Sequence, residues 1–194
     1  MEGIKTQNIL IAGVGGQGTL LTSRIIAWVL VDMGYDVKVS EVHGMAQRGG
    51  SVVSQVRYGS KVYSPVIKKG DADILLAFEK LEAARWLNYV KPAGKVIIND
   101  EQVDPLPVIS GKMKYPPNLE KQIRGFINDA TVVKATDIAL SCGEIKAANV
   151  VLVGVLASAL NLPEEKVKKA IKEMVPPKAL TVNIRAFEAG YRLS

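Results

Sequence analysis

The chain has 194 residues, of which 48% are hydrophobic and 23% charged, and this size predicts one globular domain spanning residues 1–194. A single cysteine, Cys142, excludes an internal disulfide and cannot supply the thiolates of an iron–sulfur cluster, and no metal site is expected. The net charge of +6 is spread over scattered lysines, and the densest group, at 164–174, alternates with glutamates as on a solvated helix face, so we expect no nucleic-acid partner.

The chain begins with a pattern of strand, glycine turn and helix. The apolar run at 7–14 predicts a strand, and 18–34 has the length of a helix that Gly34 would end. Residues 36–42 alternate as in a second strand. Segments 51–59 and 61–67 flank a Gly-Ser pair that suits a tight turn, so we expect them to form an inserted β-hairpin.

The rest of the chain alternates predicted strands and helices. Further strands are expected at 71–79, 94–100 and 131–135, a surface loop at 104–117, and helices at 80–90, 118–128, 148–163 and 179–194. The apolar run at 148–163 is too short to span a bilayer, and its small residues, such as Gly154, would allow close packing. With no secretory signal pattern at the start, we expect a cytoplasmic protein without a membrane partner. The predicted fold class is α/β, a Rossmann-like doubly wound, mostly parallel sheet with a β-hairpin insertion.

A glycine-rich turn follows the first predicted strand. It matches GxGxxG in the required context of a strand before and a helix after, and its candidate cofactor-binding residues are Gly13, Gly15, Gly16, Gln17 and Gly18. Glycines let the backbone approach a ligand, and a helix N-terminus offers free N–H groups to an anion. The alternative is a tight strand-to-helix turn that packs closely and binds nothing.

A dinucleotide-binding function is a second possibility. Glu41 lies about 20 residues past the glycines, where an acidic residue would meet the ribose of NAD(P). A stand-alone NAD(P)-binding oxidoreductase would use this pair of features. However, the chain after Glu41 enters the segment HGMAQRGG instead of a crossover helix, which favours another use of this sheet edge.

The segment HGMAQRGG holds the only histidine of the chain, His43, which is the one candidate catalytic residue. Glutamine and arginine side chains suit amide hydrogen bonding and bidentate anion recognition, so the segment adds Gln47, Arg48, Gly49, Gly50 and Ser51 as candidate cofactor-binding residues. No cysteine or carboxylate is placed to complete a catalytic triad. The sequence therefore predicts no self-sufficient active site in this chain.

Four segments together resemble a known family. They are GVGGQG at 13–18, EVHGMAQRGGSVVSQVRYG at 41–59, DADILLAFEKLEAARWL at 71–87 and NIRAFEAGY at 183–191. With these motifs the chain resembles the gamma-type small subunits of the 2-oxoacid:ferredoxin oxidoreductases, in the indolepyruvate branch. EVHGMAQRGG is the most specific of the four.

The resemblance implies an oxidative decarboxylation in which an aryl 2-oxoacid and coenzyme A (CoA) give an arylacetyl-CoA, CO2 and reduced ferredoxin. It implies a hetero-oligomer whose large (alpha) subunit carries the thiamine diphosphate and the iron–sulfur clusters. The residues of this chain agree, because it has one cysteine and because GDAD at 70–73 is not the GDG that opens a thiamine diphosphate motif.

Two expectations concern the partner chain. We expect Gln47 and Arg48 to meet an anionic group of CoA, of the substrate or of the partner, with His43 orienting the loop; the alternative is a loop that only packs. The helix at 148–160 and the second half of the helix at 19–31 are apolar nearly all round, so we expect part of their surface to be buried against another subunit. Burial in the domain's own core is the alternative for each helix.

Overall fold

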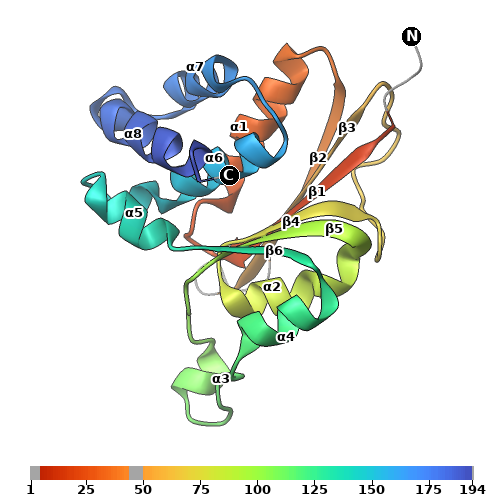
Figure 1. The fold of residues 1–194 in the computed structure, drawn as a ribbon, viewed down its shortest axis with the longest axis vertical. Coiled ribbons are helices and arrows are strands. Elements are labelled where there is room, and N and C mark those ends of the chain that lie inside the picture. The colour runs from red at the N-terminus through yellow and green to blue at the C-terminus, as the bar shows by residue number, and fades with distance from the viewer. Residues whose placement is uncertain (1–4, 44–49, 194) are drawn as a thin grey trace.

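A six-stranded sheet forms the centre of the fold in the computed structural model, which describes residues 5–43 and 50–193 (Figure 1). The strands are β1 (Gln7–Val14), β2 (Asp36–His43), β3 (Ser51–Gly59), β4 (Ala72–Ala77), β5 (Val90–Asn99) and β6 (Asp129–Val133). Their order across the sheet is β2-β3-β1-β4-β5-β6. Strand β3 pairs antiparallel with both of its neighbours, and β1, β4, β5 and β6 pair in parallel. The predicted mostly parallel α/β sheet is confirmed.

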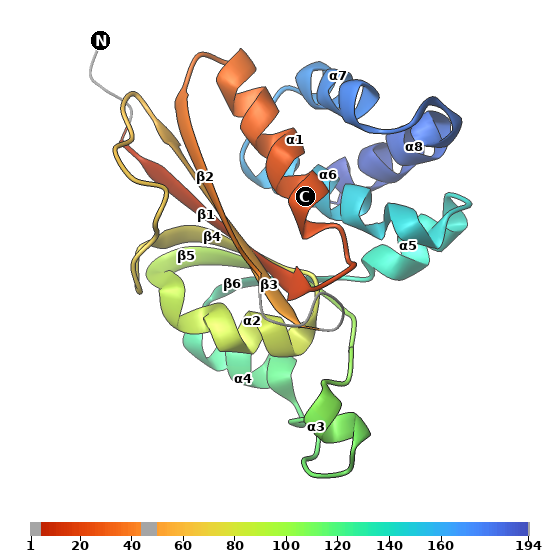
Figure 2. The same ribbon diagram turned by 180° about the vertical axis from the view of Figure 1, so that it is seen from behind.

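Helices cover both faces of this sheet (Figures 1 and 2). One face carries α1 (Thr19–Asp32), α5 (Ala135–Ser141), α6 (Ala148–Ala159), α7 (Glu164–Met174) and α8 (Leu180–Tyr191). The other face carries α2 (Lys80–Trp86) and α4 (Leu119–Phe126), while the short α3 (Leu106–Ile109) lies beyond both layers. None of the helices within the described ranges has the length and apolar character that a membrane crossing requires.

Helix α6 is the most buried helix of the larger layer, because it packs between the sheet and α8. Its residues from Asn149 to Ala157 are all buried. A Cβ on Gly154 would lie 2.3 Å from the carbonyl oxygen of Phe187, and one on Gly190 would lie 2.0 Å from that of Val151. The predicted close packing at Gly154 is confirmed, and the domain's own core, not another subunit, buries α6.

The predicted hairpin of 51–59 with 61–67 is wrong. Strand β3 pairs with β1 on one side and β2 on the other, so neither of its edges is free for a further strand. Backbone groups of segment 61–67 instead form hydrogen bonds with side chains of β3. Arg57 donates to the carbonyls of Ser64 and Val66, and Gln55 Oε1 accepts from the Ile67 N–H. The hairpin of this fold joins β2 to β3 through the HGMAQRGG segment.

Other boundaries also differ from expectation. The helix predicted at 80–90 ends as α2 at Trp86, and β5 begins at Val90 rather than at 94. The pairing of β4 with β5 shifts register at this point, and such an irregularity accommodates Pro92 within a strand. The predicted loop 104–117 contains α3, and α5 was not predicted.

Candidate functional site

Two motifs that are far apart in the sequence meet at the carboxyl end of β1. The N–H of Gly15, in the glycine turn, donates to the carbonyl oxygen of Gly50, the last residue of HGMAQRGG, at 2.9 Å. In the sheet, Val14 pairs with Ser51, and His43 pairs through its backbone with Val52. The Gly50 end of the HGMAQRGG segment is therefore held beside the glycine turn, whereas its His43 end lies on β2, two strands from β1. Gln47, Arg48 and Gly49 lie outside the described residues, as does the side chain of His43.

The glycine turn is tightly connected to its surroundings. Gln17 Oε1 accepts from the Val14 N–H at 2.7 Å, and Gln17 Nε2 donates to the Phe78 carbonyl at 3.3 Å. A Cβ on Gly13 would lie 2.8 Å from Thr19 Cγ2, and one on Gly18 would lie 2.4 Å from Asn149 Nδ2. These two glycines thus permit close packing of neighbouring elements, whatever the turn binds.

Gly16 differs from the other glycines of the turn. Its φ of +102° is a left-handed conformation that favours glycine, and nothing lies within 4 Å of where its Cβ would be. Gly18 caps α1 without a side-chain hydrogen bond to the first turn. The helix therefore presents free N–H groups and the positive end of its dipole beside Gly16.

A cleft of about 420 Å³ adjoins this turn at the carboxyl ends of β1, β4 and β5. Its lining includes Gly16, Asn99, Lys146 and Asn149, and also Glu101, whose carboxylate accepts from the Thr136 hydroxyl. The Asn149 side chain is 9% exposed, and its amide has no hydrogen-bond partner among the described residues. Because α1 and α6 both begin here and Lys146 adds a cation, the cleft can accept an anionic group.

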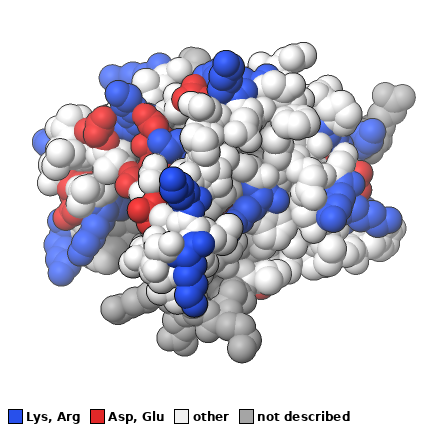
Figure 3. Space-filling view, turned by 90° about the horizontal axis from the view of Figure 1, so that it is seen from below, with Lys and Arg blue, Asp and Glu red and all other residues white. Residues whose placement is uncertain are grey.

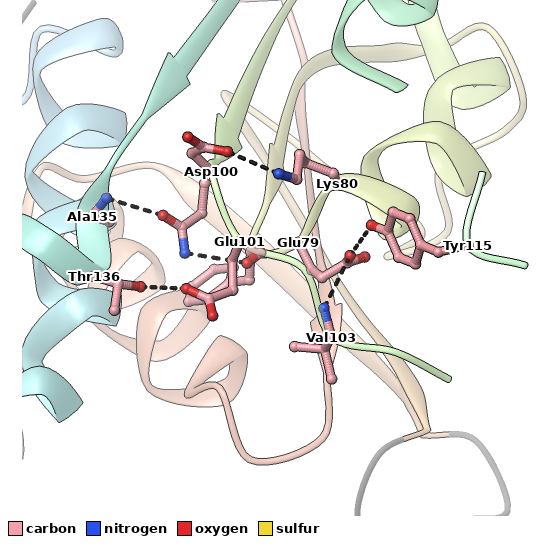
Figure 4. A network of polar contacts seen from close by, with 10 residues as sticks. Glu79, Lys80, Asp100, Glu101, Val103, Tyr115, Ala135 and Thr136 are labelled. Atoms are coloured by element: carbon pink, nitrogen blue, oxygen red, sulfur yellow. Dashed lines mark hydrogen bonds and ion pairs between the residues drawn. The ribbon is translucent and has the colours of Figure 1, made fainter. Parts of the chain in front are cut away.

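The floor of the cleft is built from polar residues that follow β4 and β5 (Figure 4). Asn99 Oδ1 accepts from the Ala135 N–H at 3.0 Å, which joins β5 to the start of α5. Thr136 donates to Glu101, and the N–H of Lys80 donates to the Glu101 carbonyl at 3.1 Å. These contacts fix the strand ends around the cleft.

Two buried carboxylates next to this region were missed from the sequence. Glu79 is 1% exposed and caps α2 by accepting from the Glu82 N–H at 2.9 Å. Glu82, 2% exposed, accepts from Ser51 and from Arg85. The candidate residue Ser51 is thereby tied to α2. Glu79 stands at the N-cap of α2, where Ser, Thr, Asp or Asn is usual, so no capping signal in the sequence indicated either position.

Glu79 also accepts a hydrogen bond from the Tyr115 hydroxyl (Figure 4). Burial, followed by the hydrogen bond and the charge of Glu79, raises the pKa of Tyr115 above its usual range. The same carboxylate accepts from the Val103 N–H at 3.4 Å. Glu79 is thus the centre of a small polar network that includes both ends of the segment around α3.

The dinucleotide interpretation finds no support in this geometry. Glu41 lies on β2, and β3 separates β2 from β1, so the acidic residue is two strands away from the glycine turn. At about 4.8 Å per strand, this doubles the separation found where the second strand adjoins the first. Glu41 Oε1 instead lies 3.4 Å from the Ser23 hydroxyl of α1.

No group of three or more His, Cys, Asp or Glu side chains that could hold a metal ion occurs within residues 5–43 and 50–193. Three lysines of α7 are engaged in ion pairs: Lys166 and Lys169 with Asp32 of α1, and Lys168 with glutamates. Lys168 lies 2.7 Å from Glu164 and 2.8 Å from Glu188. The candidate functional site consists of the cleft, the glycine turn and the Gly50 end of HGMAQRGG.

Known proteins resemble this chain over nearly its whole length. Residues 8–193 match the family described as pyruvate ferredoxin/flavodoxin oxidoreductase. The chain is 41% identical to the indolepyruvate oxidoreductase subunit IorB of Thermococcus kodakarensis, an alignment that covers 97% of this chain and 96% of the relative.

Solved structures share the fold. The pyruvate oxidoreductase subunit PORC of Thermotoga maritima has a TM-score of 0.73 at 22% identity, covering 97% of this chain and 96% of that one. The 2-oxoglutarate:ferredoxin oxidoreductase of Magnetococcus marinus, solved with 2-oxoglutarate, coenzyme A and succinyl-CoA bound, has a TM-score of 0.77 at 21% identity, covering 97% of this chain and 31% of that one. The family match and the identity to IorB confirm the resemblance inferred from the motifs: this chain belongs to the pyruvate ferredoxin/flavodoxin oxidoreductase family and is a subunit of an oxidoreductase.

Proposed function

We propose that this chain is the small subunit of an indolepyruvate or arylpyruvate:ferredoxin oxidoreductase and is active only with its large subunit. The 41% identity to a subunit named for indolepyruvate, over nearly the full length of both chains, supports this substrate class. In the reaction, an aryl 2-oxoacid and CoA give an arylacetyl-CoA and CO2, and two electrons pass to ferredoxin.

Thiamine diphosphate and iron–sulfur clusters, which this reaction uses, do not fit this chain. One cysteine cannot hold a cluster. In the GDAD segment, Asp73 accepts from the Asn8 N–H at 2.8 Å and pairs with Lys91, so it is engaged in structural contacts. Both groups belong to the large subunit in our proposal. We place the complex in the cytoplasm, where cluster-forming thiols stay reduced.

The role of this chain in the proposal is to hold an anionic part of CoA between the glycine turn and HGMAQRGG. The observation that carries it is the hydrogen bond from Gly15 to Gly50, which joins the two motifs beside the N-terminus of α1. Gly16 leaves room for a ligand at the turn, and Lys146 and Asn149 extend the polar lining of the cleft. Arg48 and Gln47 would add bidentate and amide contacts to a phosphate.

The test is reconstitution of the complex. The chain is co-purified anaerobically with the large subunit of the same organism, and viologen reduction by indolepyruvate is measured with and without CoA. We expect activity that requires both chains and CoA. Failure of the chain to associate with a folded, cofactor-loaded large subunit would refute the proposed function.

The CoA-binding role has its own test. Arg48→Ala should raise the KM for CoA at least about tenfold, because a charged hydrogen bond to a phosphate is lost. Arg185→Ala is the matched control, since Arg185 lies exposed on α8 and makes no ion pair with the described residues. If KM for CoA, KM for the 2-oxoacid and complex formation are all unchanged in the Arg48 variant, this residue has no recognition role.

A further inference from the structure

The segment 104–117, which we call the arm, projects from the body of the molecule. In both ribbon views α3 lies beyond the layer of α2 and α4 (Figures 1 and 2). Within the arm, the backbone N–H of Ser110 donates to the Leu106 carbonyl at 2.9 Å, and the N–H of Met113 donates to the Pro107 carbonyl at 3.0 Å. The arm is therefore a locally folded turn, although it lies outside both hydrophobic clusters.

Three large apolar side chains of the arm are exposed to solvent. Leu106 is 76% exposed, Ile109 70% and Met113 64%. Leu106 and Ile109 are three residues apart in α3 and so share one side of the helix. The hydrogen bond from the Met113 N–H to the Pro107 carbonyl brings the backbone of Met113 back beside α3. None of the three contributes to the core, so the folding of this chain does not account for them.

The base of the arm is held at both ends by one buried carboxylate. Glu79 accepts from Val103, just before the arm, and from Tyr115, near its end (Figure 4). This connection fixes the arm relative to α2. A protruding apolar turn on a fixed base loses little conformational entropy when it binds.

The surroundings of the apolar tip are basic. Lys112 and Lys114 are exposed, and the one acidic residue of the arm, Asp104, is its first residue. A cleft of about 590 Å³ adjoins Tyr115, Pro116 and Pro117. Its lining includes Lys121, together with Lys80 and Arg124, which form ion pairs with Asp100 and Glu120. Seen from the α3 end, Lys and Arg side chains stand out on the nearest surface, while acidic side chains gather to the left (Figure 3). A complementary surface would be apolar at its centre and acidic at its rim.

We propose that the arm inserts into an apolar pocket, rimmed by carboxylates, on the large subunit of the oxidoreductase. The identity of this partner rests on the proposed function. A second copy of this chain is a poorer occupant, because two arms meeting across a twofold axis would bring Lys112 and Lys114 of both copies together. The arm is an assembly element distinct from the CoA-binding role proposed for the glycine turn.

The test compares two double variants in the full chain. Leu106→Ser with Ile109→Ser should weaken binding to the large subunit at least about tenfold, as measured by titration calorimetry. Lys112→Glu with Lys114→Glu should also weaken binding, and more strongly at about 0.05 M than at about 1 M salt, because ions screen exposed charges. Since all four side chains are exposed, thermal unfolding of the free chain should be unchanged.

Matched controls lie far from the arm. Leu140→Ser replaces an apolar residue of α5 that is 63% exposed, and Lys68→Glu with Lys69→Glu reverses an exposed lysine pair. Neither control should weaken binding more than about twofold. If wild type reconstitutes activity and the arm variants bind as tightly as the controls, only the arm proposal fails. If wild type does not bind the large subunit, the proposed function fails too. Loss of a homodimer, instead of the heteromeric complex, would overturn the assigned partner.

Discussion

Helix α6 and the arm both carry large apolar side chains, but only α6 buries them. In α6, Val150 to Val153 and Leu156 are fully buried between the sheet and α8. In the arm, Leu106, Ile109 and Met113 keep most of their surface in water. Apolar character in α6 thus serves the folding of this chain, whereas in the arm it is available for a partner. Substitutions in α6 should therefore change the stability of this chain, whereas substitutions in the arm should change only its proposed binding to a partner.

The largest effect on stability is expected where α6 meets α8. Gly190→Ala would place a Cβ 2.0 Å from the Val151 carbonyl oxygen. Because the clashing atoms of Val151 belong to the backbone of α6, the clash can be relieved only by moving the two helices apart. We expect a loss of about 4 kcal/mol or more in the free energy of unfolding. Urea unfolding followed by circular dichroism measures this loss.

Gly125→Ala is the control for that variant. Gly125 lies in the exposed part of α4, and nothing is within 4 Å of where its Cβ would be. Because alanine has a higher helix propensity than glycine, the free energy of unfolding of this variant should rise by about 0.5–1 kcal/mol. A similar loss in both variants would show that close helix packing at Gly190 is not what makes it necessary.

A pair of truncations sharpens the same comparison. Leu152→Ala, in α6, removes a side chain with no exposed surface and should cost about 3 kcal/mol of unfolding free energy. Ile109→Ala, in the arm, should change it by less than about 0.5 kcal/mol. Equilibrium unfolding of the two free variants decides this. A cost above about 1.5 kcal/mol at Ile109 would mean that the Ile109 side chain packs on the domain and is not free to bind a partner.

The parts of the fold that were predictable depend on local pattern. The strand, glycine turn and helix at the start, the helix at 148–163 and the alternation of strands and helices were all visible in periodicity and glycine placement. The two strands that pair with β3 were not predictable in this way, because strand order in a sheet depends on contacts between distant segments. Helix α5 was missed for a similar reason, since the hydrogen bond from Ala135 to Asn99 connects residues 36 positions apart.

The candidate site was predictable in its motifs but not in its connections. The residues of the glycine turn and Gly50 were singled out, and the structure joins them through one backbone hydrogen bond. Glu79, Glu82 and Asn149 were missed, because their roles come from burial beside segments distant in the sequence. The separation of Glu41 from the turn was equally hidden, as it follows from strand order.

The smallest effect is expected at the connection between the core and the arm. Tyr115→Phe removes the hydrogen bond to Glu79 and should cost about 1 kcal/mol of unfolding free energy, with faster hydrogen exchange in the arm. Because the pKa of Tyr115 is raised in the folded state, its contribution is complete below about pH 10 and is lost as the pH rises further. The difference in stability between wild type and variant should therefore shrink above about pH 10. If hydrogen exchange in the arm is the same in both proteins, the hydrogen bond from Tyr115 to Glu79 does not fix the end of the arm, and only the bond from the Val103 N–H is left to hold its base.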